Sequence, residues 1–226
     1  MKYKGICFLT EYNTLKKICT VAVLHEDEIM EVGKIAAAFT DEERDAIISI
    51  LQQKGEEQYK GMYIVPPGIC LQVGYKGIKD YQLIAPVYIS LAVGEKWAAC
   101  TWTKLQLSQY EAVNITNPEK ILWTDQSITK ELYLDYLLTI SDSMLPFLKD
   151  RLLTIKRYPE GVSSEGFYQK STPDYAPGFV KTALNHNINY TVCNNIETLL
   201  WLGNQSAIEY HIPFNKINDW NPAEIV

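Results

Sequence analysis

The amino-acid sequence predicts an α+β protein built from two successive units, a small β-barrel followed by a mixed α/β domain. Two observations predict this division. The first hundred residues consist mostly of short β-rich runs between turn residues, with one helical segment among them. The second half alternates two helical segments with several short strands. We place the boundary after residue 104, so that the expected units are 1–104 and 105–226, a division that 226 residues can accommodate.

In the first unit, residues 19–24 and 28–35 are expected to form strands joined by a hairpin tip at 25–28. Thr40 and Glu43 have the spacing of a capping box, which predicts a helix that starts there and ends near Lys54. Residues 69–73 and 82–91 predict further strands. Several strands around one inserted helix fit a small barrel such as an OB-fold, and periodicity alone leaves other small β folds open.

In the second unit, Thr129 is expected to cap a helix that runs through Met144 and ends near Pro146. Strands are expected at 152–157, 166–170, 188–193 and 207–212, and a second helix at 196–205. The sequence contains no internal repeat and no low-complexity linker. These elements complete the α+β pattern.

Composition limits the classes of function. The formal net charge is −6, and neither half of the chain is basic. A protein that coats DNA indiscriminately is usually basic, so any binding of nucleic acid is expected to depend on local clusters of cations. No stretch approaches the roughly 20 apolar residues of a membrane span, and we find no signal-peptide pattern. The expected location is the cytoplasm.

The five cysteines are scattered, and none forms a Cys-x-x-Cys pair. This spacing argues against a zinc site and against a disulfide framework. We therefore expect buried free thiols and no metal site.

Six stretches of the second half carry a resemblance to a known family. They are ITNPEKILW at 115–123, ITK at 128–130, RYPEG at 157–161, GFYQK at 166–170, TLLWL at 198–202 and AIEYH at 207–211. In this order they resemble the polymerase domain of bacterial ligase D, an archaeo-eukaryotic-primase-like enzyme of non-homologous end joining. The resemblance implies DNA double-strand-break repair as the setting, DNA ends with a 5′-phosphate as the ligand, and the bacterial cytoplasm, in association with the nucleoid, as the location.

The first half is similar to the C-terminal OB-fold domain of ATP-dependent DNA ligases. The similarity lies in EVGK at 31–34, FTDEE at 39–43 and the Pro67-Gly68 pair before a strand. Ligase D proteins of bacilli place the ligase before the polymerase, which is the order seen here.

The resemblance implies a pocket for the 5′-phosphate formed by Asn117, Lys120 and Lys130. Ammonium groups and an amide donor suit a phosphate dianion. Lys130 would also begin a helix, whose free N–H groups favour an anion. The alternative is that these are ordinary surface side chains.

Further contacts with DNA are expected from Lys156, Arg157 and Lys170. Phe167 or Tyr168 is expected to stack on a base while the other faces the core, and we choose Phe167 as the stacking residue. The resemblance also makes His211 a candidate for the nucleotide site.

Catalytic motifs of the family are missing from the sequence. The segment resembling residues 222–226 precedes, in the family, an Asp-x-Asp that holds divalent metal ions, and this sequence stops before it. There is no Lys-x-Asp-Gly for adenylation, and the segment at 88–96 that corresponds to a basic motif lacks arginine. The family uses ATP with Mg²⁺ or Mn²⁺. For this chain we expect an incomplete polymerase domain that holds no cofactor and does not catalyse a reaction on its own. Since the family consists of enzymes, whether this chain is one stays open.

Three functions remain open. The chain could be a component of end joining that binds phosphorylated ends, a non-catalytic module that docks on Ku or on a separate ligase or polymerase polypeptide, or a fragment of an active enzyme completed by another segment.

Overall fold

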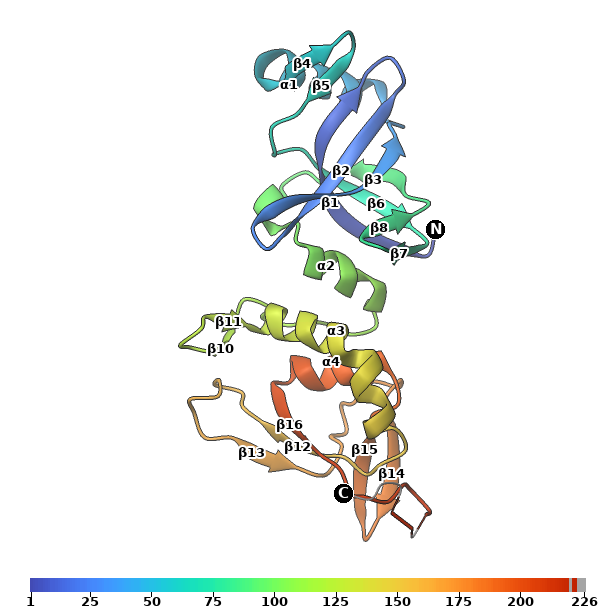
Figure 1. Cartoon of the computed structure of the whole chain (residues 1–226), viewed down its shortest axis with the longest axis vertical. Helices are drawn as coiled ribbons and strands as arrows, with labels where there is room; N and C mark the ends of the chain where they lie inside the picture. Colours follow the sequence, from blue (N-terminus) through green and yellow to red (C-terminus); the bar gives the residue numbers. More distant parts are fainter. Residues whose placement is uncertain (220, 223–226) are drawn as a thin grey trace. The chain divides into compact units, whose positions relative to one another are not determined.

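The computed structural model describes residues 1–219, 221 and 222. The chain divides into two units, Met1–Tyr110 and a second that begins at Glu111, coloured blue to green and green to red in Figure 1. The expected boundary at 104/105 falls inside helix α2 (Trp102–Leu107). Leu105 of this helix is 1% exposed and belongs to the core of the first unit, where its carbonyl accepts a hydrogen bond from the Tyr75 hydroxyl at 2.9 Å.

The first unit is organised around one long strand, β1 (Tyr3–Asn13). It pairs along one edge with β2 (Ile18–His25), and along the other with β6 (Cys70–Tyr75) near its start and β5 (Met62–Ile64) near its end. Strands β3 (Glu28–Ala36), β4 (Glu56–Tyr59) and β9 (Val87–Leu91) complete a curled antiparallel sheet of seven strands. Both faces of β1 are covered, because Cys7 and Leu9 belong to one core cluster and Phe8 to another, and all three are fully buried.

The expected OB-fold is not confirmed for this unit. Among the described residues no ladder joins β3 to β9 or β4, so the strands form a curled sheet whose closure into a barrel is not seen. The run expected at 82–91 is interrupted at Ala85-Pro86, where Ala85 adopts a positive φ of 49°. It forms β8 (Gln82–Ile84), which pairs with β7 (Gly77–Lys79), and then β9.

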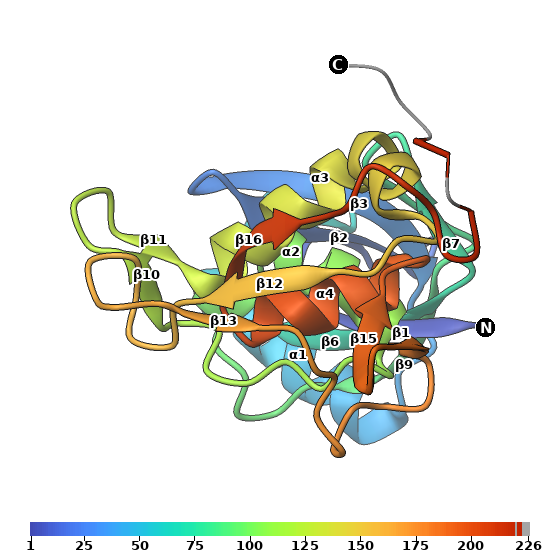
Figure 2. The ribbon, with the colours of Figure 1, turned by 90° about the horizontal axis from the view of Figure 1, so that it is seen from below.

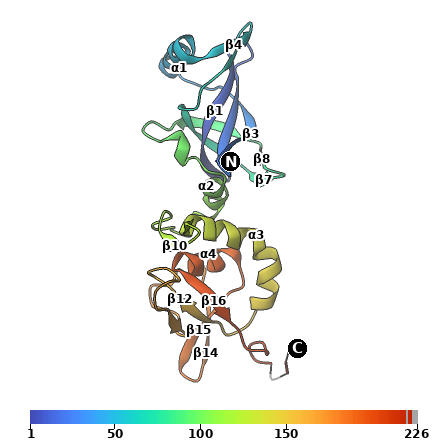
Figure 3. The same cartoon turned by 60° about the vertical axis from the view of Figure 1, so that its left-hand side comes forward.

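Helix α1 (Asp41–Lys54) begins as the sequence predicts. The Thr40 hydroxyl accepts a hydrogen bond from the Glu43 amide at 3.2 Å, and the Glu43 carboxylate accepts one from the Thr40 amide at 2.9 Å. Ile47 and Leu51 bury the apolar side of the helix. Figure 3 shows α1 beside β4, which follows it in the chain.

The second unit contains two packed helices and a three-stranded sheet. Helix α3 (Lys130–Leu148) lies along α4 (Ile196–Asn204), as Figure 3 shows. The helices approach closely at Gly203, where an added Cβ would lie 2.4 Å from Leu137 Cδ1. In the sheet, β12 (Thr154–Arg157) is central between β13 (Phe167–Gln169) and β16 (Ala207–His211). Figure 2 shows β12 crossing in front of α4.

Two hairpins complete the second unit. Strands β10 (Ile121–Trp123) and β11 (Ile128–Thr129) lead directly into α3, and β14 (Lys181–Asn185) pairs with β15 (Ile188–Val192). Residues 223–226, the greater part of the segment expected to precede the metal-binding aspartates, lie outside the described residues. No described helix is long and apolar enough to cross a membrane. All five cysteines are buried as free thiols.

Candidate nucleic-acid interface

A turn at residues 116–120 packs on the first residues of α3 and brings the three expected phosphate ligands into one local structure. The carbonyl of Asn117, which has a positive φ of 46°, accepts a hydrogen bond from the Lys120 amide at 3.1 Å. The Lys120 carbonyl in turn accepts one from the Lys130 amide at 2.7 Å. Asn204, at the end of α4, anchors the turn through its amide oxygen, which accepts from the Thr116 amide.

Lys130 is buried in this structure. The residue is 4% exposed, and its Nζ donates a hydrogen bond to the Thr116 carbonyl at 2.7 Å. Burial lowers the pKa of the Lys130 ammonium group, and the positive charge of the neighbouring Lys120 lowers it further. Lys130 therefore holds the turn at 116–120 against the helix.

The expected free amides at the start of α3 are not present, and this expectation was wrong. The Lys130 amide donates to Lys120, the Glu131 amide donates to Pro118 at 2.9 Å, and the Leu132 amide donates to the Thr129 hydroxyl at 3.3 Å. Because the chain itself satisfies these donors, the helix terminus offers an anion its partial charge but not its first N–H groups.

Lys120 is the more accessible cation of this turn. Its Nζ lies 3.3 Å from the Glu160 carboxylate, and the two side chains are 31% and 78% exposed. Asn117 is exposed beside it. Sequence reasoning did not anticipate Glu160, although it belongs to one of the recognised stretches, because the pairing depends on residues 40 positions apart.

The three-stranded sheet carries the second group of expected residues and presents them on opposite faces. Lys156 points to the same side as Tyr168 and Glu209, its cross-strand partners in β13 and β16. Arg157 points to the other side with its partner Phe167, and its guanidinium carbon lies 5.4 Å from the centre of that ring. Lys156 and Arg157 therefore cannot form one continuous cationic patch on a single face.

Arg157 is held by two neutral acceptors. Its Nε donates to the Gln205 carbonyl at 2.9 Å, and its Nη1 donates to the Gln169 side chain at 2.9 Å. These two acceptors orient the Arg157 guanidinium but do not neutralise its positive charge. Lys170, just beyond β13, is exposed.

Both aromatic residues of β13 are exposed, Phe167 by 47% and Tyr168 by 60%. The expectation that one of them faces the core was wrong. Strand β13 lies at the edge of the sheet, and at these two residues no other described element covers either of its faces fully. The sequence stretch shows the alternation but not the position of the strand within the sheet.

On the face that carries Lys156, three polar side chains contact the carboxylate of Glu209. Its Oε1 accepts a hydrogen bond from the Tyr158 hydroxyl at 2.6 Å and lies 3.2 Å from Lys156 Nζ, while its Oε2 lies 2.9 Å from His211 Nε2. The hydrogen bonds from Tyr158 and Lys156 lower the pKa of the Glu209 carboxyl to about 2. Sequence reasoning missed Glu209, although its i, i+2 spacing from His211 on a strand places both on one face.

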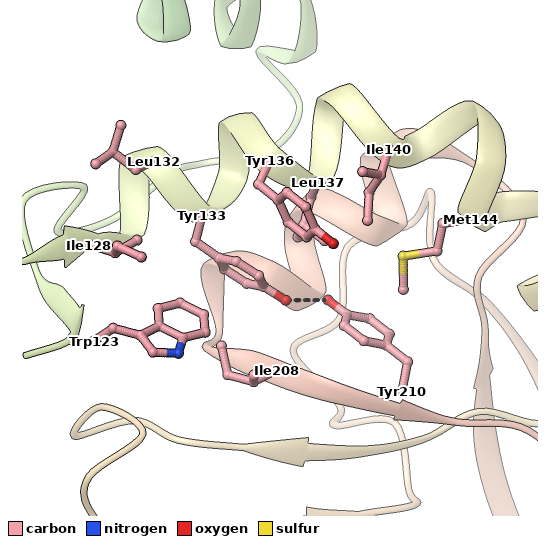
Figure 4. A pocket seen from close by; sticks show the side chains of 10 residues that line it. All are labelled: Trp123, Ile128, Leu132, Tyr133, Tyr136, Leu137, Ile140, Met144, Ile208 and Tyr210. Carbon is pink, nitrogen blue, oxygen red and sulfur yellow. Dashed lines mark hydrogen bonds between the residues drawn. The ribbon is translucent and has the colours of Figure 1, made fainter. Parts of the chain in front are cut away.

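An apolar cavity of about 560 Å³ lies between α3 and β16. Figure 4 shows the side chains that line it: Trp123, Ile128, Leu132, Tyr133, Tyr136, Leu137, Ile140, Met144, Ile208 and Tyr210. The Tyr133 and Tyr210 hydroxyls lie 3.5 Å apart at its inner wall, and Tyr133 also donates to the Ala207 carbonyl at 2.7 Å. Leu132 and Tyr136 are 53% and 56% exposed, so the cavity opens to solvent.

The described residues contain no group of three or more His, Cys, Asp or Glu side chains that could hold a metal ion.

The second unit packs a helix pair on a three-stranded sheet, and the recognised stretches lie on its turn, its sheet and its helices. Residues 129–226 match the family model described as LigD, primase-polymerase domain. The whole chain is 35% identical over 234 aligned residues to the bifunctional non-homologous end joining protein LigD of Bacillus subtilis, of which it covers 38%. The chain is thus related to bacterial LigD along its length, and the resemblance stated from its sequence is confirmed.

Half of the chain is also 33% identical over 117 residues to the multifunctional LigD of Mycolicibacterium smegmatis, covering 15% of that protein. Among solved structures, the polymerase domain of Mycobacterium tuberculosis ligase D in complex with DNA aligns with 46% of this chain and 38% of that one, at 29% identity and a TM-score of 0.44. The ligase domain of M. tuberculosis LigD aligns with 43% of this chain and 36% of that one, at 11% identity and a TM-score of 0.37. The chain spans well under half the length of the curated relatives it matches.

Proposed function

We propose that this chain contributes DNA-end recognition to bacterial non-homologous end joining, by binding a 5′-phosphate at Asn117 and Lys120 on the turn that Lys130 supports. The relationship to proteins named for end joining supports the setting. The observation that carries the proposal is the turn itself, because it brings an exposed amide side chain and an accessible ammonium group together at the start of α3.

The geometry gives the three residues different roles in this proposal. Lys120 and Asn117 are the direct donors, and a phosphate would replace Glu160 as the partner of the Lys120 ammonium group. Lys130 is a positioning residue, because its Nζ already donates to the Thr116 carbonyl. Arg157, Phe167 and Lys170 are proposed to contact the DNA beyond the phosphate.

The test compares the binding of two duplexes with a recessed end that differ only in a 5′-phosphate or a 5′-hydroxyl, followed by fluorescence anisotropy. The wild-type chain is expected to prefer the phosphorylated end. Lys120→Ala is expected to remove about 1.5–3 kcal/mol of binding, which is roughly a tenfold loss of affinity or more for the phosphorylated end alone.

Lys149→Ala is the matched control, since it removes an exposed lysine at the other end of α3. It is expected to weaken binding to both duplexes slightly and equally. Equal affinity of the wild-type chain for the two ends, or equal effects of the two lysine substitutions, would contradict the phosphate pocket.

The open apolar cavity on α3 favours a second candidate function, that of a protein-interaction module. Exposed Leu132 and Tyr136 at its rim are unusual for a surface that faces only water. In this case Tyr136→Lys is expected to abolish co-purification with a ligase or polymerase polypeptide, or with Ku, while leaving the preference for phosphorylated ends unchanged.

A further inference from the structure

The face of the sheet that carries Lys156 contains a set of donors that converge on one carboxylate. The Lys156 ammonium, the Tyr158 hydroxyl and the His211 ring come from β12, from the residue that follows it and from β16. All three lie within 3.2 Å of an oxygen of Glu209. Ammonium, hydroxyl and imidazole groups are also the donors that proteins direct at a phosphate oxygen.

The packing around these donors fixes their positions. Lys156 Nζ lies 5.1 Å from the centre of the Tyr158 ring and 5.4 Å from the centre of the Tyr168 ring. The Tyr158 ring lies against Gly166, where an added Cβ would be only 2.6 Å from Cε1 of the ring. The ammonium group is therefore held between two aromatic rings and directed at Glu209.

The site remains open to solvent. The side chains of Lys156, Glu209 and His211 are 24%, 37% and 48% exposed. In the free chain the charge of Lys156 is compensated by Glu209, so a phosphate that approaches this face meets a pair with no net charge. Arg157, the next residue of the same strand, differs from Lys156 because its two hydrogen-bond acceptors are neutral.

We propose that Lys156, Tyr158 and His211 form an anion site whose resident anion is the Glu209 carboxylate of the chain itself, and that a nucleic-acid phosphate binds there in competition with Glu209. This inference rests on the proposed function, because it assigns the phosphate to a DNA strand bound on the sheet. Glu209 then sets how strongly this face attracts the backbone of the strand, and Lys156 contributes little to phosphate binding while the glutamate is present.

The salt dependence of DNA binding measures this competition. Glu209→Gln keeps the shape of the side chain and removes its charge, and it is expected to increase affinity several-fold at low salt. It is also expected to steepen the plot of log Kobs against log salt by about 0.7–0.9, the value for one additional phosphate contact. Lys156→Ala alone is expected to leave this slope unchanged, and in the Glu209→Gln background it is expected to abolish the gain.

Asp142→Asn is the matched control, because Asp142 is an exposed acid on α3 and its substitution changes the net charge equally. It is expected to leave the slope unchanged. Two outcomes would contradict the competition. One is that Lys156→Ala, in the presence of Glu209, reduces the magnitude of the slope by about one. The other is that Glu209→Gln leaves the slope unchanged.

Titration with inorganic pyrophosphate, followed by NMR shifts of the Lys156 and His211 side chains, tests the site without DNA. Tighter binding to Glu209→Gln than to the wild-type chain, by about fivefold or more, supports the competition. Equal binding, or no binding to either protein, overturns it. If the wild-type chain does not bind DNA, but Glu209→Gln still binds pyrophosphate more tightly than wild type, the proposed function is contradicted and the anion site is supported.

Discussion

Lys130 has a structural role at the turn that carries the proposed phosphate site. Its aliphatic part is buried, and its ammonium group satisfies the Thr116 carbonyl, which would otherwise lose its partner. The sequence identifies the lysine and its place at the start of a helix, but the direction of the side chain depends on the turn at 116–120. A loss of DNA binding in a Lys130 variant therefore has to be separated from a loss of fold.

We expect Lys130→Ala to lower the free energy of unfolding of the chain by about 1–3 kcal/mol, because it leaves a carbonyl without its partner and removes buried methylenes. Lys120→Ala is expected to change it by less than about 1 kcal/mol, because its ion pair with Glu160 is exposed. Urea denaturation followed by circular dichroism measures both. Equal stabilities of the two variants would mean that Lys130 does not support the turn.

Glu209 makes the stability of the second unit depend on pH. Hydrogen bonds from Tyr158 and Lys156 depress its pKa from the ordinary value of 4.5 to about 2 in the folded chain. A depressed carboxyl pKa gives a contribution to stability that is complete above about pH 4.5 and is lost as the pH falls towards 2. Wild type is therefore expected to be more stable than Glu209→Gln at pH 7.

The difference between the two proteins is expected to shrink as the pH is lowered from 5 to 2.5. Urea midpoints measured across this range test the expectation. A difference that stays constant with pH would mean that Glu209 has the same pKa in the folded and unfolded chains.

At the scale of single elements, helix α4 depends on Asn195 as its N-cap. The Asn195 side chain accepts a hydrogen bond from the Thr198 amide at 2.8 Å, at the start of a helix that is almost entirely buried. We expect Asn195→Ala to destabilise the second unit by about 1 kcal/mol, and Asn195→Ser to have a smaller effect because serine also caps helices. Thermal unfolding measures the difference, and equal melting temperatures for the two variants would contradict the role of the cap.

The elements that could be predicted from the sequence are those whose signals are local. The capping box at Thr40 and the N-cap at Thr129 start α1 and α3 where expected, because each cap involves residues only three positions apart. Strand β1 was not anticipated, since a central strand buried on both faces lacks the alternation of a half-buried one. The run at 82–91 is split by the positive φ at Ala85, a conformation that alanine does not favour and that the sequence therefore does not predict.

The candidate site follows the same division between local and long-range information. The turn at 116–120 and the start of α3 could be anticipated as neighbours, because they flank one short hairpin. The partners Glu160 and Glu209 could not, because each pairs with a lysine 40 or more positions away in the chain. The structure thus adds the carboxylates that pair with two of the predicted cations.

For the whole molecule, the net charge of −6 bears on the proposed binding of DNA. Without a general attraction to the phosphate backbone, affinity has to come from the few cations that are free to face a ligand. Among the candidate cations, Lys130 donates to a carbonyl and Lys156 pairs with a carboxylate. The other three are more available: the partner of Lys120 is exposed, the partners of Arg157 are neutral, and Lys170 is itself exposed. If DNA binds only through these candidate residues, as we propose, about three phosphate contacts are expected.

At about 0.9 released counterions per contact on duplex DNA, the slope of log Kobs against log salt is expected to lie between about −2 and −3. A series of binding measurements from low to physiological salt gives this slope. The double substitution Lys120→Ala and Arg157→Ala is expected to bring it to about −1. A wild-type slope of about −6 or steeper would mean that many more cations contact DNA than the turn and the sheet provide, and that recognition of DNA by this chain is not confined to the end.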